Sequence, residues 1–301
     1  YIKRNPITLY QSQHRGGKGK TAMGTKEKDF VKHLFVASTH HTFLFFTNKG
    51  KVYWCKVYDL PMAGRQSRGK AIVNLLNLEQ GEKPTTILAV PTFDPGHNVI
   101  MATRNGIIKK TDLMAFSRPR VGGIIAITLL DGDELIAARI TDNTLDVFLG
   151  SAMGKSIRFH ESDIRASGRT AQGVRGMRLD PEDKLVGMEV LSHAQTLFTI
   201  TENGFGKRTS TDEYPVQRRG GKGVITIKTS ERNGKVVAIL LVAEDDELML
   251  MTSSGKIIRM PIKGISVISR NTQGIKLVGM DPKERVMGAV GLAERDEVEP
   301  E

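Results

Sequence analysis

The hydrophobic residues of this chain recur in short alternating runs, and long helical patterns are absent. Five times, an alternating run leads through a short turn to glycine and then to a second run that carries Lys or Arg. Glycine permits the positive φ of a tight hairpin turn, and β-branched or aromatic residues on both sides favour paired strands. The pattern predicts five β-hairpins, whose turn glycines lie 48 to 56 residues apart, at Gly50, Gly106, Gly154, Gly204 and Gly255.

A second pattern alternates with the hairpins. It is a basic loop that ends in glycine and continues into another alternating strand, and its closing glycines lie 50 to 54 residues apart, at Gly19, Gly69, Gly123, Gly173, Gly223 and Gly274. An acidic or polar turn and an apolar strand complete each unit, so a unit of about fifty residues holds about four strands. One such unit cannot bury both faces of its sheet, and the repeats therefore predict a ring of sheets, as in a β-propeller.

The chain has six basic loops but only five complete hairpins. Tyr1–Arg4 matches the second strand of a hairpin, and Val286–Leu292 resembles the missing first strand. We therefore predict an all-β fold of six four-stranded blades, with the two chain ends close together. The blades would form one domain over residues 1–293, followed by an acidic tail at residues 294–301. The chain starts without Met, which indicates a fragment of a longer chain.

The charge of the chain points to a polyanionic partner. Its 301 residues include 44 Lys and Arg against 33 Asp and Glu, a net charge of +11, although the last eight residues are mostly acidic. The sequence pI is about 9.7. Such an excess favours nucleic acid or an anionic membrane surface, and a basic protein with neither partner is the alternative.

Several function classes lack their motifs. The single cysteine, Cys55, cannot form an internal disulfide or a CxxC metal site, and it fits a reducing cytoplasm. No apolar run is long enough to span a membrane. Two phosphate-loop lookalikes end at Gly19 and Gly154 but have His14 and Leu149 where the first glycine belongs. Neither the histidines nor the Ser and Tyr residues form a metal or nucleophile motif, so we expect no catalytic site, metal or cofactor here.

The basic loops match the chemistry of a DNA backbone. Arginine binds phosphate through two N–H groups, and glycine lets backbone N–H groups approach a phosphate. The predicted DNA-binding residues are Gln13, Arg15, Gly16, Gly17, Lys18, Gly19 and Lys20 in the first loop and Gln217, Arg218, Arg219, Gly220, Gly221, Lys222 and Gly223 in the fifth. The four weaker loops contribute Arg65, Arg68, Lys70, Arg118, Arg120, Arg169, Arg175, Arg270 and Lys276.

One loop per blade would place these residues around the perimeter of the ring, as a basic belt suited to a bent polymer. The alternative is a charged face that serves solubility alone. No aromatic residues are interleaved with the basic ones, which favours duplex over single-stranded DNA.

A further basic set lies on the hairpins, at Lys109, Lys110, Arg158, Lys207, Arg208 and Arg259. Two interpretations stay open for these residues. They would either extend the belt or protect an exposed strand edge from pairing with other chains.

The motif QRRGGKG at Gln217–Gly223 resembles the box of the C-terminal domain of the DNA gyrase A subunit. The resemblance extends over the whole chain and includes Gln13–Gly19, Lys56–Pro61, Ile72–Leu76, Gly173–Gly176 and Arg270–Gly274. It implies a six-bladed β-pinwheel, a propeller relative in which neighbouring blades exchange strands. The first copy departs from the family pattern, because His14 replaces an arginine and the intact box sits in the fifth unit.

The resemblance also implies a function. The domain would wrap duplex DNA around its edge with a fixed hand and present a crossing to the cleavage core, so that ATP-driven strand passage introduces negative supercoils. The cleaving tyrosine, the ATPase site and Mg²⁺ would belong to other parts of an A2B2 enzyme in the bacterial cytoplasm, at the nucleoid. The acidic tail would compete with DNA for the belt.

Two other interpretations remain at this point. The chain would be the equivalent domain of topoisomerase IV, whose box is typically degraded and whose blades are often fewer, or a propeller that serves as a protein-interaction scaffold. Two well-formed boxes and six units favour gyrase, and the scaffold predicts no basic perimeter and no preference for duplex DNA.

Overall fold

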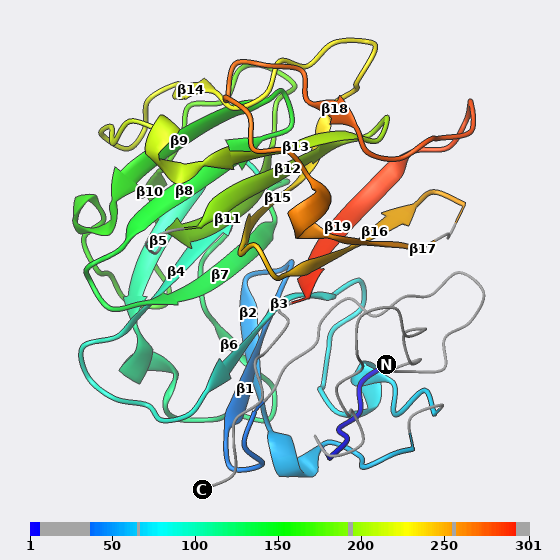
Figure 1. Cartoon of the computed structure of the whole chain (residues 1–301). Helices are drawn as coiled ribbons and strands as arrows, with labels where there is room; N and C mark the ends of the chain where they lie inside the picture. The colour runs from blue at the N-terminus through cyan, green and yellow to red at the C-terminus, as the bar shows by residue number, and fades with distance from the viewer. Residues whose placement is uncertain (7–36, 65–66, 192–194, 255–256, 293–301) are drawn as a thin grey trace, which may run out of the picture.

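Five antiparallel sheets follow one another along the chain in the computed structural model, which describes residues 1–6, 37–64, 67–191, 195–254 and 257–292 (Figure 1). A hairpin forms the centre of each sheet. The five hairpins are β1 (Thr42–Thr47) with β2 (Lys51–Lys56), β4 (Asn98–Thr103) with β5 (Ile107–Asp112), β8 (Asp146–Ser151) with β9 (Lys155–His160), β12 (Thr196–Thr201) with β13 (Phe205–Ser210), and β16 (Glu247–Thr252) with β17 (Ile257–Pro261).

A seven-residue strand lies on the inner side of each hairpin and pairs with its first strand. These inner strands are β3 (Pro84–Val90), β7 (Leu135–Thr141), β11 (Leu185–Leu191), β15 (Val236–Val242) and β19 (Val286–Leu292). Neighbouring inner strands contact one another in this order. Apolar side chains of adjacent sheets pack against one another. Phe46 of the first sheet, for example, packs in a cluster with Met101 and Leu135 of the second. Strands such as β1 and β4 are buried at every position, because side chains on both of their faces pack against neighbouring segments.

A two-residue strand from the next unit completes the outer side of four sheets. These short strands are β6 (Ile124–Ile125) on β2, β10 (Val174–Arg175) on β5, β14 (Val224–Ile225) on β9 and β18 (Ile275–Lys276) on β13. The exchange of strands between neighbouring units is therefore present. It also covers the outer edge of each of these hairpins, which would otherwise expose unpaired backbone groups.

A second contact links each of these sheets to the following unit. The residue four positions after the hairpin glycine donates a side-chain hydrogen bond to a carbonyl in or next to the short 3-10 helix of that unit. The pairs are Trp54 with Phe116 (2.7 Å), Lys110 with Glu161 (3.1 Å), Arg158 with Thr211 (2.9 Å) and Arg208 with Ile265 (2.7 Å). The 3-10 helices are η2 (Val57–Asp59), η3 (Ile72–Asn74), η4 (Leu113–Phe116), η5 (Glu161–Asp163), η6 (Thr211–Glu213) and η7 (Ile262–Gly264).

The prediction of six blades is wrong. The described residues form five sheets, four with four strands and the last, β17-β16-β19, with three. Val286–Leu292 does not pair with Tyr1–Arg4, because it is the inner strand of the fifth sheet. Tyr1–Arg4 instead forms isolated bridges from Ile2 to Lys70 and from Arg4 to Met62. The two segments that were to build a sixth sheet thus have different partners.

No helix in the described part of the chain has the length and apolar character that crossing a bilayer requires.

The turn glycines adopt a positive φ and leave no room for a side chain, which can be tested at Gly154. Its φ is +80°, and a Cβ there would overlap the carbonyl oxygen of Ile227 in the next unit. We predict that Gly154→Ala lowers the free energy of unfolding by about 2 kcal/mol or more, measured by urea denaturation. Gly264→Ala is the control, because a Cβ at Gly264 meets no atom within 4 Å. Equal stability of the two variants would contradict this account.

Candidate nucleic-acid interface

The fourth, fifth and sixth basic loops are each attached at both ends to the outer strand of the preceding sheet. In the fourth loop, Ala166 forms a parallel bridge to Lys110, and Val174 pairs with Ile108. Residues 167–173 must therefore bulge away from the strand between these points. The fifth loop repeats the geometry on β9 and the sixth repeats it on β13, with bridges at Val216 and Val267 and short strands that begin at Val224 and Ile275.

The closing glycine of each loop lets the chain return to that strand. Gly223 has a φ of +72°, and a Cβ at this position would overlap the carbonyl oxygen of Ser156. Gly220, earlier in the same loop, donates its N–H to the carbonyl of Gly176 at 2.6 Å. These two glycines of the intact box therefore shape the loop, and the N–H of Gly220 already has a protein partner.

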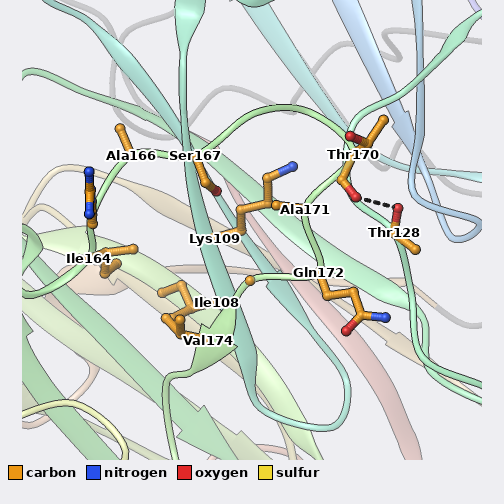
Figure 2. A pocket seen from close by; sticks show the side chains of 12 residues that line it. Ile108, Lys109, Thr128, Ile164, Ala166, Ser167, Thr170, Ala171, Gln172 and Val174 are labelled. Atoms are coloured by element: carbon orange, nitrogen blue, oxygen red, sulfur yellow. Dashed lines mark hydrogen bonds between the residues drawn. The ribbon is translucent and has the colours of Figure 1, made fainter.

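A buried lysine lies beneath the fourth loop. Lys109 projects from β5 between Ser167 and Ala171, in a shallow hollow lined by the loop (Figure 2). Only 1% of its surface is exposed, and its Nζ donates to the carbonyls of Ala126, at 2.7 Å, and Arg169. The lysine ammonium thus holds the inner side of a loop whose outer side faces solvent.

Lys207 plays the same part beneath the sixth loop. Its Nζ donates to the carbonyls of Ser269 (2.7 Å) and Arg270 (2.6 Å) and to Thr272 Oγ1 (3.1 Å). Burial lowers the pKa of both Lys109 and Lys207 to about 8, since it disfavours the charged form. Ile157 holds the equivalent position under the intact box.

Both interpretations of the hairpin cations were wrong for the four that are buried, which are Lys109, Lys110, Lys207 and Arg208. Their charged groups bond to backbone carbonyls of neighbouring units, and they neither extend a belt nor protect an open edge. Arg158 is partly buried and pairs with Asp146 at 2.7 Å. Arg259 is exposed and pairs with Glu247 on the neighbouring strand of its own hairpin.

The loop cations fall into two groups. The half-buried Arg169, Arg219 and Arg270 bond to backbone carbonyls. Gln217, also half-buried, donates its backbone N–H to the Arg158 carbonyl. The exposed residues are Arg68, Lys70, Arg118, Arg120, Arg175, Arg218, Lys222 and Lys276. The predicted residues Gln13, Arg15, Gly16, Gly17, Lys18, Gly19, Lys20 and Arg65 lie outside the described residues.

An acid lies beside the intact box. Asp180 Oδ1 is 3.5 Å from Lys222 Nζ, and its other oxygen pairs with Lys155. The hydrogen bond from Lys155 is the main reason that the pKa of Asp180 lies below its usual value. Lys222 remains largely exposed in this pair, so its ammonium is still available to a second anion.

Three exposed cations beside the loops were missed by the sequence analysis, namely Arg165, Arg178 and Lys228. Arg178 and Lys228 each follow a closing glycine by five residues. Their backbone N–H groups donate to carbonyls of the next loop, at Gly221 and Thr272, both at 2.8 Å. A basic residue at that fixed offset was the available signal, and it lay in the segment that was predicted only as an alternating strand after the loop.

The chain is similar to proteins of one family along nearly its whole length. The family described as DNA gyrase C-terminal domain, beta-propeller, matches residues 1–38, 41–91, 97–142, 145–192, 195–243 and 246–290. The first of these segments lies largely outside the described residues. The DNA gyrase A subunit of Salmonella typhimurium is 49% identical over 98% of this chain and 34% of its own length. The Escherichia coli K12 protein is 48% identical over the same shares. This chain thus spans about a third of these relatives.

Two solved structures share the fold. A DNA gyrase A C-terminal domain has a TM-score of 0.76 at 24% identity, covering 97% of this chain and 96% of that one. The C-terminal domain of a DNA topoisomerase IV has a TM-score of 0.78 at 24% identity, covering 84% and 80%. At this identity the likeness shows the fold alone.

The buried Lys207 predicts a pH-dependent stability. The folded chain binds the Lys207 proton less tightly than the unfolded chain does, because the pKa falls from 10.5 to about 8. Between these values the unfolded state holds more protons, so this group makes the free energy of unfolding rise with pH. We predict a smaller rise between pH 8 and pH 10 for Lys207→Met than for the wild type, measured by urea denaturation, because Lys109 still contributes its own part, whereas the exposed Lys235→Met keeps the full rise. Parallel curves for wild type and Lys207→Met would show that the lysine is not held as described.

Proposed function

The chain belongs to the DNA gyrase C-terminal domain family, and on that premise we propose that it binds duplex DNA without base specificity along the outer edges of its sheets. The observation that carries the proposal is the repeated basic loop, attached to one outer strand after another. Each described loop presents exposed Arg or Lys side chains, which suit phosphate contacts. Duplex is favoured over single strands because the described loops expose no aromatic side chain for base stacking.

The spacing of the loops supports wrapping rather than binding at one point. The loops succeed one another with the sheets, and backbone hydrogen bonds join the third loop to the fourth, the fourth to the fifth and the fifth to the sixth. A duplex that contacts several of them in turn has to bend, and phosphate contacts made along the path offset the bending energy. We propose that this bend has a fixed hand and that gyrase uses it to introduce negative supercoils.

The remaining parts of the reaction would lie outside this chain. We propose that it works within an A2B2 gyrase of the bacterial cytoplasm, whose other regions hold the cleaving tyrosine, the ATPase site and Mg²⁺. We assign no catalytic residue and no cofactor to this domain. The 48–49% identity to gyrase A proteins favours this assignment over topoisomerase IV.

Binding should depend steeply on salt. If the belt makes about 6–10 phosphate contacts, duplex affinity falls by a factor of about 10³–10⁵ between 50 and 200 mM salt, measured by fluorescence anisotropy. Replacing both Arg118 and Arg120 by Gln should lower the salt slope by about two. Lys235→Gln is the control, because Lys235 precedes β15 on the opposite side of its sheet from the loops. Undetectable or salt-independent binding of the wild-type chain would exclude this function and leave the scaffold interpretation.

Wrapping should change DNA topology. When a nicked plasmid is religated with the chain bound, we predict a change in linking number of one sign that grows with the amount of protein. Lys235→Gln should give the wild-type change. Binding without any change would reduce the function to duplex binding.

A further inference from the structure

One arginine of the box recurs at the same place in three loops and makes the same bond in each. It precedes the closing glycine by four residues. Its Nη1 donates to the carbonyl of the second residue of the preceding unit's short strand. The bonds run from Arg169 to Ile125 (3.3 Å), from Arg219 to Arg175 (3.1 Å) and from Arg270 to Ile225 (3.1 Å).

A backbone hydrogen bond accompanies the arginine at each of these junctions. The N–H five residues after one closing glycine donates to the carbonyl two residues before the next. The bonds run from Thr128 to Ala171 (3.2 Å), from Arg178 to Gly221 (2.8 Å) and from Lys228 to Thr272 (2.8 Å). Successive loops are thus joined directly by two bonds, besides their separate attachments to the sheets.

The two arginines of the intact box differ in their surroundings. Arg219 is half-buried, and besides Arg175 its Nε donates to the carbonyl of Asp163 at 2.9 Å. Two backbone segments therefore hold its guanidinium in one orientation. Arg218 is exposed, and its side chain makes no hydrogen bond or ion pair within the described part of the chain. The third loop has Pro119 at the position of Arg219, so this bond is missing there.

We infer that Arg219, with Arg169 and Arg270, is a positioning residue that sets the spacing between successive loops, while Arg218 contacts the DNA backbone. The inference rests on the proposed DNA binding, and it assigns different roles to the two arginines of the intact box. A guanidinium bonded to two carbonyls of the protein orients the loop, because its planar shape fixes the angle between the segments it joins. An exposed guanidinium with freely rotating bonds instead neutralises a phosphate without changing the path that the loops define.

The two roles predict different losses on substitution. Each lost phosphate contact lowers the salt slope by about 0.9, so Arg218→Gln should reduce the slope by about one. At saturating protein it should keep the wild-type linking-number change. Arg219→Gln should keep the salt slope but reduce the linking-number change per bound chain at least twofold, because the loops no longer hold the DNA on one path. Arg219→Lys should show the same loss, since it retains the charge without the planar pair of donors.

The result that overturns the inference is a reversal of this pattern. If Arg219→Gln lowers the salt slope by about one and Arg219→Lys restores both the slope and the linking-number change, then Arg219 is an ordinary phosphate contact. Lys235→Gln serves as the control in each assay and should match wild type.

A measurement without DNA separates this inference from the proposed function. The Arg178 amide donates to the Gly221 carbonyl across the junction that Arg219 spans. Hydrogen exchange of this amide should accelerate at least tenfold in Arg219→Gln and stay at the wild-type rate in Arg218→Gln. Unchanged exchange in both variants would refute the positioning role even if the wild-type chain binds DNA. Absence of DNA binding by the wild type would refute the proposed function and leave the exchange test valid.

Discussion

The structure depends on the attachment of the basic loops to the outer strands of the preceding sheets. In the fourth, fifth and sixth loops, a short strand and an isolated bridge hold the two ends, so the loop bulges between them. The same contact covers the open edge of the hairpin and links one unit to the next. Fold and interface are therefore not separate features of this chain, because the segment that completes the sheet also carries the exposed cations.

Positive charge has two uses in this domain. The ammonium groups of Lys109 and Lys207 are buried, and backbone carbonyls there replace the water that burial removes. Arg118 and Arg218 keep theirs on the surface. A net charge of +11 therefore overstates the charge available to a polyanion, since part of it holds the loops in place.

The loops are unequal, and the differences are local. The intact box has Ile157 beneath it and Asp180 beside Lys222, whereas the sixth loop rests on a lysine. The third loop has two exposed arginines but Pro119 in place of the arginine that would bond to the preceding unit. A duplex following the belt would meet a different combination of charge and rigidity at each sheet, so the path is set by several unlike contacts.

The repeating unit could be predicted from the amino-acid sequence, because hairpin turns and loop closures need glycine at fixed places. Gly154 and Gly223 occupy such places with positive φ. The alternation of apolar residues likewise predicted the strands, and the motif at Gln217–Gly223 predicted the family. These are local signals, readable from neighbours in the chain.

Which segments meet and which cations are exposed depended instead on contacts in three dimensions. Val286–Leu292 became the inner strand of the fifth sheet rather than the partner of Tyr1–Arg4, because each hairpin pairs with the seven-residue strand that follows it in the chain. Lys207 and Arg218 look alike as basic residues, yet one lies under a loop and the other on its surface. That difference arises from contacts between units about fifty residues apart, which no local pattern records.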